Sequence, residues 1–139
     1  MTAHSGKIIG TILVVEDEEE VRDVAVEMFV NEDFHVLVAA DATTAYQVFE
    51  SHPEIDLVFS DLILPGGTTG IDLAKRILAR KADSLIILVT GYGEKGSATQ
   101  ASIVNTRNMY FIPKPYDITR IPSLARSMLN NRATSKIFS

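Results

Sequence analysis

Side chains that could do chemistry follow short apolar runs at four points in this sequence. They are Glu16 and Asp17 after residues 11–15, Asp61 after 57–59, Thr90 after 85–89 and Lys114 after 109–112. Carboxylates that are brought together repel one another and raise one another's pKa values unless a cation intervenes. Their hard oxygens suit Mg²⁺, which keeps several waters and accepts phosphate oxygens. An ammonium and a hydroxyl group can hold an anion beside it, and a carboxylate facing a metal-bound phosphoryl group can attack it to form an acyl phosphate.

The elements that must position these residues are predicted from the spacing of apolar residues. Mainly apolar runs predict five strands, at 11–15, 34–39, 57–59, 85–89 and 109–112, of which the first and third should be buried. Helical spacing predicts five helices, at 18–31, from 42 to near Pro53, at 71–78, 94–107 and 118–129. Strands that alternate with helices are typical of a doubly wound α/β domain with a parallel sheet. The carboxyl ends of parallel strands share one edge of the sheet, so the candidate residues should meet there.

Local signals set some of the expected boundaries. Asp41 is a plausible N-cap for the second helix, and Pro122 should lie in the first turn of the last helix, where a missing N–H is tolerated. The stretch 94–107 carries a thin apolar stripe, and residues 130–139 are expected to form a frayed tail. The expected division is an extension at 1–10, one domain at 11–130 and a tail at 131–139.

Composition restricts the class of protein. A chain of 139 residues is expected to form one domain, and a net charge of -5 argues against a broad basic surface for nucleic acid. The sequence has no cysteine, which excludes disulfides, thiolate metal sites and thiol catalysis. No apolar run reaches the length of a membrane helix, about 20 residues. We therefore expect a cytoplasmic domain with no direct contact with membranes or nucleic acid.

Four motifs together resemble the receiver domain of response regulators in two-component phosphorelay signalling. They lie at 12–18, 56–65, 88–91 and 111–115, each at a strand end, and the resemblance covers about 12–129. It implies a flavodoxin-like fold with strand order 2-1-3-4-5 and a Mg²⁺ ion that Mn²⁺ can replace. It also implies that the phosphoryl donor is a histidine kinase or a histidine phosphotransfer protein. Such a domain catalyses its own phosphorylation and dephosphorylation but is not a conventional enzyme.

The resemblance also assigns roles to single residues. Asp61 matches the phosphoacceptor, and Glu16 and Asp17 match the acidic pair that binds the metal with it. Thr90 matches the hydroxyl residue that follows the phosphoryl group, and Lys114 matches the lysine that pairs with that group.

Further positions are implied to tune or transmit the signal. Phe111 matches an aromatic switch that works with Thr90, although a strand aromatic can also be plain core. Ile63 should offer its backbone carbonyl to the metal, and Ile63 and Tyr92 should flank the path of the water that removes the phosphoryl group. The bond between Lys114 and Pro115 is expected to be cis. The resemblance also allows a homodimer through the helix at 94–107, the last strand and the last helix.

Several alternatives remain open from the sequence. The loop 65–70 is longer than the shortest family form and resembles receivers fused to hybrid sensor histidine kinases. A Mg²⁺-dependent phosphohydrolase with an Asp nucleophile is the enzymatic alternative, but it would need a second Asp two residues after the nucleophile. A flavodoxin-type flavin domain would need a phosphate-binding loop where residues 16–20 are acidic. A pure interaction domain would not respond to Mg²⁺ with an acyl-phosphate analogue.

Overall fold

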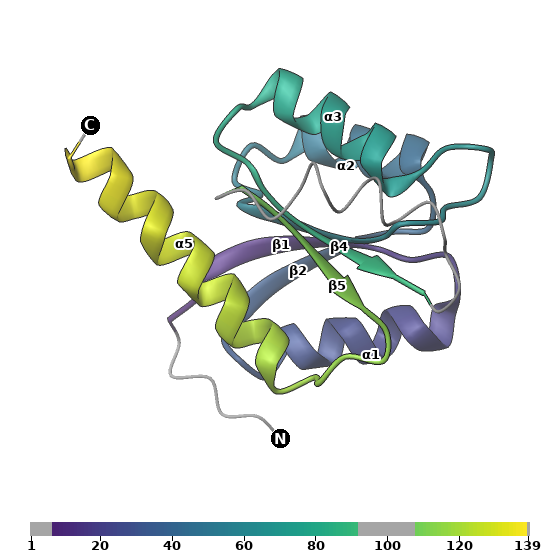
Figure 1. The fold of residues 1–139 in the computed structure, drawn as a ribbon, viewed down its shortest axis with the longest axis horizontal. Helices are drawn as coiled ribbons and strands as arrows, with labels where there is room; N and C mark the ends of the chain where they lie inside the picture. The colour runs from purple at the N-terminus through teal and green to yellow at the C-terminus, as the bar shows by residue number, and fades with distance from the viewer. Residues whose placement is uncertain (1–6, 92–107, 139) are drawn as a thin grey trace.

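A five-stranded parallel sheet in the order β2-β1-β3-β4-β5 forms the centre of the molecule (Figure 1). The computed structural model describes residues 7–91 and 108–138. The strands are β1 (Gly10–Val15), β2 (Phe34–Ala39), β3 (Leu57–Asp61), β4 (Leu85–Thr90) and β5 (Met109–Pro113). Apolar runs form these strands because both faces of the sheet are covered, and β4 is buried at every position. The predicted fold class and strand order are confirmed.

Helices cover both faces of the sheet. Those within the described residues are α1 (Glu19–Val30), α2 (Ala42–Ser51), α3 (Gly70–Arg80) and α5 (Arg120–Phe138). Figure 1 shows α2 and α3 on one face, with α1 on the other. Ala125 of α5 packs with Phe29 of α1, so α5 covers the α1 face. The helix expected at 94–107 lies outside the described residues.

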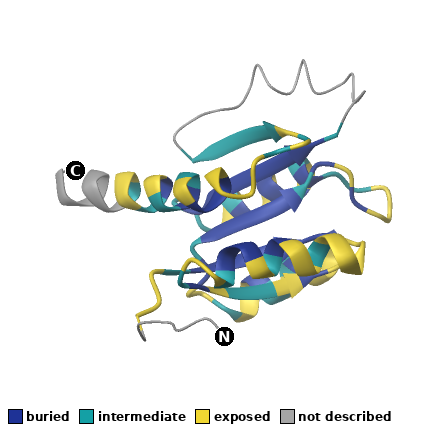
Figure 2. Ribbon diagram, turned by 90° about the horizontal axis from the view of Figure 1, so that it is seen from below, coloured by how far each residue is buried: buried dark blue, intermediate teal, exposed yellow. Residues whose placement is uncertain are grey.

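The central strands are the most deeply buried elements, as the dark blue ribbons of Figure 2 show. One apolar cluster lies between the sheet and α1 and α5, and it includes Phe29, Phe34 and Phe59. A second cluster lies between the sheet and α2 and α3, and it includes Phe49 and Ile77. No helix among the described residues combines the length and apolar character that a membrane span requires.

Side chains near the helix starts fix where two of the helices begin. The Asp41 carboxylate accepts a hydrogen bond of 2.7 Å from the Thr44 N–H, so the predicted N-cap of α2 is confirmed. At α3, Thr69 and Asp72 form a reciprocal capping box. Gly70 follows Thr69 directly, and a Cβ atom at Gly70 would collide with the carbonyl oxygen of Asp61. Glycine therefore lets the start of α3 approach the end of β3 closely.

The last helix differs from its predicted extent. Pro122 lies in its first turn as expected, but α5 continues to Phe138, so the expectation of a frayed segment from 130 onward is wrong. The Arg132 guanidinium donates a hydrogen bond of 2.7 Å to the Asp56 carboxylate and one of 3.4 Å to the Asp83 carbonyl. These contacts hold the helix against the end of the sheet where β3 begins. The division of the chain into extension, domain and tail stays a prediction.

Candidate functional site

The ends of four strands bring the candidate residues to one edge of the sheet. Val15 is in register with Ser60, Asp61 with Val89, and Thr90 with Pro113. The acidic pair Glu16 and Asp17 and the cation Lys114 each follow directly after one of these strands. The sequence-based prediction that Glu16, Asp17, Asp61, Thr90 and Lys114 share one edge therefore agrees with the strand register.

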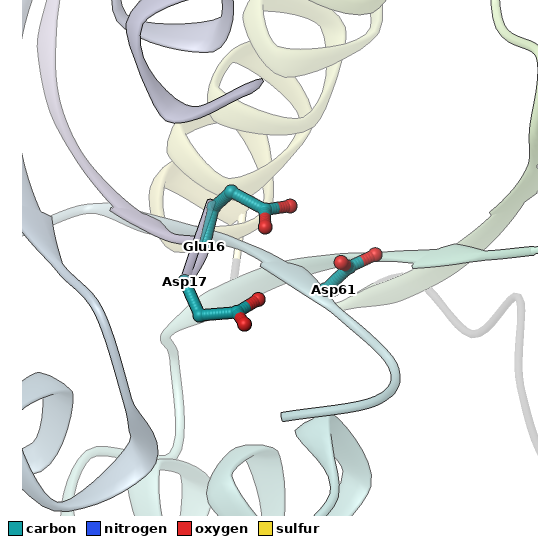
Figure 3. A group of neighbouring side chains, drawn as sticks. All are labelled: Glu16, Asp17 and Asp61. Atoms are coloured by element: carbon teal, nitrogen blue, oxygen red, sulfur yellow. The ribbon is translucent and has the colours of Figure 1, made fainter. Parts of the chain in front are cut away.

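Glu16, Asp17 and Asp61 form a group of carboxylates at this edge (Figure 3). Each offers one carboxylate oxygen, and these oxygens all lie within 4.8 Å of one another. Glu16 is buried, Asp61 is half-buried and Asp17 is exposed, so the group opens to solvent on the Asp17 side. Such a set of hard oxygen donors in reach of one point fits a divalent cation.

The environment of Glu16 favours its neutral form. Burial is the main cause that raises its pKa, and the neighbouring Asp61 carboxylate adds to the effect. The Glu18 N–H donates a hydrogen bond of 2.9 Å to the Glu16 carboxylate and opposes the shift. The net result raises the pKa of Glu16 from 4.5 to about 7. Charge repulsion of this kind is what a bound cation would relieve.

Lys114 is the cation that faces the carboxylates. Its ammonium lies 3.2 Å from a carboxylate oxygen of Asp61. Burial disfavours its charge, but the hydrogen bond to Asp61 and the charges of Asp61 and Glu16 outweigh burial and raise the pKa of Lys114. The Lys114 backbone N–H donates a hydrogen bond of 2.7 Å to the Thr90 carbonyl, which fixes the chain directly after β5. The bond from Lys114 to Pro115 is cis, so that prediction is confirmed.

The residues expected to transmit or tune a signal lie around this edge. Thr90 is buried at the end of β4. Phe111 is half-buried in register with Leu88 and packs against the apolar cluster on the α2 and α3 side. Ile63 is 57% exposed and pairs with Thr69 in the loop between β3 and α3. Tyr92 lies outside the described residues.

Tyr116 borders the same recess as Glu16, Asp61 and Lys114, and sequence reasoning missed it. Its ring lies edge-on against Phe59, with ring centroids 5.9 Å apart. Burial raises the pKa of the Tyr116 hydroxyl, and Asp61 and Glu16 raise it further while Lys114 opposes them. The hydroxyl therefore stays neutral beside the carboxylates. Its position two residues after Lys114 is the one signal by which the sequence could have indicated it.

Comparison with known proteins identifies the family. The sequence pattern that defines the response regulator receiver domain matches residues 12–126. The chain belongs to this family. Receiver domains are the phosphoacceptors of two-component signalling and interact with histidine kinases or phosphotransfer proteins. They are signalling domains rather than conventional enzymes.

Individual relatives place this receiver domain among proteins of different length. It is 28% identical over 123 residues to the Sensor kinase CckA of Brucella abortus, which covers 88% of this chain and 13% of that protein. It is 27% identical over 118 residues to Sporulation initiation phosphotransferase F of Bacillus subtilis, which covers 85% of this chain and 92% of that protein. Among the first curated relatives, the chain spans 13% of CckA and 27% of the Regulatory protein AtoC of Escherichia coli. It therefore corresponds to one part of those proteins.

Solved structures show the same fold. The NtrX protein of Brucella abortus has a TM-score of 0.81 and 26% identity, over 94% of this chain and 29% of that chain. A CheY-like receiver domain protein of Methanospirillum hungatei has a TM-score of 0.78 over 91% of this chain and 98% of that chain. At 21% identity, the second likeness concerns the fold alone.

Proposed function

We propose that Asp61 is the residue of this receiver domain that accepts the phosphoryl group, and that the donor is a phosphohistidine on a partner protein. The observation that supports the proposal is the position of Asp61 between the carboxylates of Glu16 and Asp17 and the ammonium of Lys114. Its carboxylate lies within 4.8 Å of those of Glu16 and Asp17, and 3.2 Å from the Lys114 ammonium. A carboxylate in this position can act as a nucleophile while the Lys114 ammonium, and a cation that the carboxylates would hold, attract the incoming anion.

The transfer step forms one bond and breaks one. A carboxylate oxygen of Asp61 attacks the phosphorus atom, and the bond from phosphorus to the imidazole nitrogen of the donor breaks. The electron pair of that bond returns to the imidazole, which takes up a proton, and an acyl phosphate remains on Asp61. Lys114 balances charge on the phosphoryl oxygens, and the Thr90 hydroxyl donates a hydrogen bond to one of them.

The acidic group would hold Mg²⁺, or Mn²⁺ in its place. The ligands are the carboxylates of Glu16, Asp17 and Asp61 and the backbone carbonyl of Ile63. When bound, the cation neutralises the carboxylates and polarises the phosphoryl oxygens. We expect weak binding, because much of the coordination shell of Mg²⁺ stays water.

The output of the domain is a change of conformation. New charge at Asp61 draws in the Thr90 hydroxyl and biases the packing of Phe111, which is half-buried on β5 in register with Leu88, two residues before Thr90. A homodimer through the segment 94–107, β5 and α5 is one way to read out this change. Ile63 and Tyr92 set how quickly water removes the phosphoryl group.

The relatives offer two contexts for this domain, the long CckA sensor kinase and the short Sporulation initiation phosphotransferase F. This chain is a receiver domain that works in the cytoplasm, either alone or as part of a hybrid sensor histidine kinase. The coding sequence on either side of it would decide between these two.

Intact-mass measurement tests the central proposal. Incubation with acetyl phosphate and Mg²⁺ should add one phosphoryl group to the wild type and none to Asp61→Asn. The adduct should be labile in base, as an acyl phosphate is. A base-labile adduct of equal yield on Asp61→Asn would overturn the assignment.

A further inference from the structure

Two contacts between the same two segments lie next to each other in this structure. The first is the ion pair between Asp61 on β3 and Lys114 after β5, at 3.2 Å. The second is the ring contact between Phe59 and Tyr116, with centroids 5.9 Å apart and ring planes at 88°. Phe59 lies two residues before Asp61, and Tyr116 lies two residues after Lys114. Phe59 and Asp61 share a face because they lie two apart on β3, and Tyr116 contacts the first while Lys114 contacts the second, so the ring pair lies next to the charge pair.

The four side chains border one recess at the edge of the sheet, together with Glu16. Asp61, Lys114 and Glu16 form its polar part, and the two rings form part of its apolar wall. Phe59 is itself held edge-on by Phe29 of α1, with centroids 5.3 Å apart. The ring of Tyr116 is therefore anchored to the buried core through Phe59.

Pro113 and Pro115 restrict the backbone on either side of Lys114, but they do not fix its side chain. Lys114 lies beyond the end of β5, and a lysine side chain has four rotatable bonds whose freedom is lost when the ammonium is held in place. Its backbone N–H bonds to the Thr90 carbonyl on one side of the segment. On the other side, the edge-on contact of Tyr116 ties the segment to Phe59 in the core.

We infer that Tyr116 is a positioning residue for phosphoryl transfer: its ring, seated on Phe59, fixes the segment 114–116 and so holds the Lys114 ammonium against Asp61. This inference rests on the proposed function of Asp61. It assigns the effect to the ring, because edge-to-face geometry needs an aromatic side chain and does not need the hydroxyl.

Rates of phosphorylation by acetyl phosphate with Mg²⁺ test the inference. Tyr116→Ala should slow the reaction on the order of tenfold or more, because a small displacement of a catalytic group has large effects on rate. Tyr116→Phe should restore the rate close to that of the wild type. Tyr110→Ala is the matched control, because Tyr110 is also half-buried against the apolar cluster of α1 and α5 but does not border the recess. It should keep the wild-type rate.

The same substitution in a Lys114→Gln protein distinguishes a positioning role of Tyr116 from a general loss of structure. In a Lys114→Gln protein, the slow remaining rate should change little when Tyr116→Ala is added, because the ring then has no ammonium to position. An equal loss in both backgrounds would overturn the inference. Where Tyr116→Ala does not fold, Tyr116→Leu replaces it, since leucine keeps bulk but loses the edge-on contact, and it should be slow while Tyr116→Phe is fast.

The proposed function and this inference fail in different ways. If the wild-type protein gains no phosphoryl group, both the proposed function and this inference are wrong. If Tyr116→Ala and Tyr116→Leu are phosphorylated on Asp61 as fast as the wild type, only the role inferred for Tyr116 is wrong.

Discussion

Burial of Glu16 beside Asp61 links the stability of the metal-free domain to pH. The folded protein raises the pKa of Glu16 from 4.5 to about 7, so folding favours the protonated form. The stability that this proton supplies is fully present below pH 4.5 and is lost as the pH rises through about 7. At about 1.4 kcal/mol for each pKa unit, the full effect would be roughly 3.4 kcal/mol. Because the site opens to solvent on the Asp17 side, screening reduces it, and we expect the unfolding free energy of the metal-free wild type to fall by about 2 kcal/mol across this window.

Urea denaturation at several pH values, with a chelator present, measures this loss. Glu16→Gln removes the titrating group, so its unfolding free energy should change less between pH 5 and pH 8 than that of the wild type. Glu27→Gln, on the exposed part of α1, serves as the control and should keep the wild-type pH dependence. Parallel curves for the wild type and Glu16→Gln would contradict the prediction.

Ile63 should act as a shield for an acyl phosphate on Asp61. It is exposed, lies two residues after Asp61, and has no polar group to orient an attacking water. Ile63→Asn and Ile63→Glu supply such a group and should shorten the half-life of the phosphorylated protein, on the order of tenfold. The decay of the phosphorylated protein in the presence of Mg²⁺ gives the half-life. Ile8→Asn is the control, because Ile8 is a similarly exposed isoleucine before β1. Equal half-lives for all four proteins would show that Ile63 is no shield.

Among the described side chains of α5, Arg132 and Arg126 make ion pairs that differ in burial. The side chains of Arg132 and Asp56 are 19% and 25% exposed, whereas those of Arg126 and Glu32 are 38% and 46% exposed. Arg132→Gln should lower the unfolding free energy by about 1.5–3 kcal/mol, because it removes a partly buried hydrogen bond between charged groups. Arg126→Gln should cost at most about 1 kcal/mol. Urea denaturation compares the two, and equal losses would contradict the argument.

The elements themselves were largely predictable, because their signals are local. Each strand contains a continuous apolar run, and the cap of α2 depends only on Asp41 and Thr44, three residues apart. The extent of α5 was not predictable, because Arg132 finds its partner Asp56 at a distance of 76 residues along the chain. The Thr69 and Asp72 capping box was a local signal that we did not use.

The candidate site was predictable for a related reason. Parallel strands place their carboxyl ends along one edge, so residue types at strand ends identify Glu16, Asp61 and Lys114 without knowledge of distances. The same reasoning could not identify Tyr116. The positioning role inferred for Tyr116 depends on its contact with the ring of Phe59. In the sequence, both residues look like ordinary aromatic residues of the core.

For the domain as a whole, the acidic group should couple metal binding to stability. Mg²⁺ at about ten times its dissociation constant should stabilise the wild type by about 1.4 kcal/mol, which corresponds to a rise in Tm of several degrees. Asp17→Asn should lose this rise, because it removes a ligand. It should also raise the Tm of the metal-free protein, because it relieves repulsion among carboxylates.

Thermal unfolding with and without Mg²⁺, at matched ionic strength in NaCl, distinguishes these effects. Asp23→Asn, on the exposed face of α1, should respond to Mg²⁺ as the wild type does. An Asp17→Asn protein that gains the full Mg²⁺-dependent rise would contradict the assignment of the ligand.

An acid lies at or just before each end of the short strand β3. Each of these acids pairs with a cation that comes much later in the sequence. Asp56 pairs with Arg132 and Asp61 with Lys114, and both cations follow the last strand, β5. During synthesis on the ribosome, β3 therefore emerges with neither charge compensated. On the proposed role of Lys114, transfer to Asp61 in a nascent chain should therefore be slow until β5 has emerged and joined the sheet.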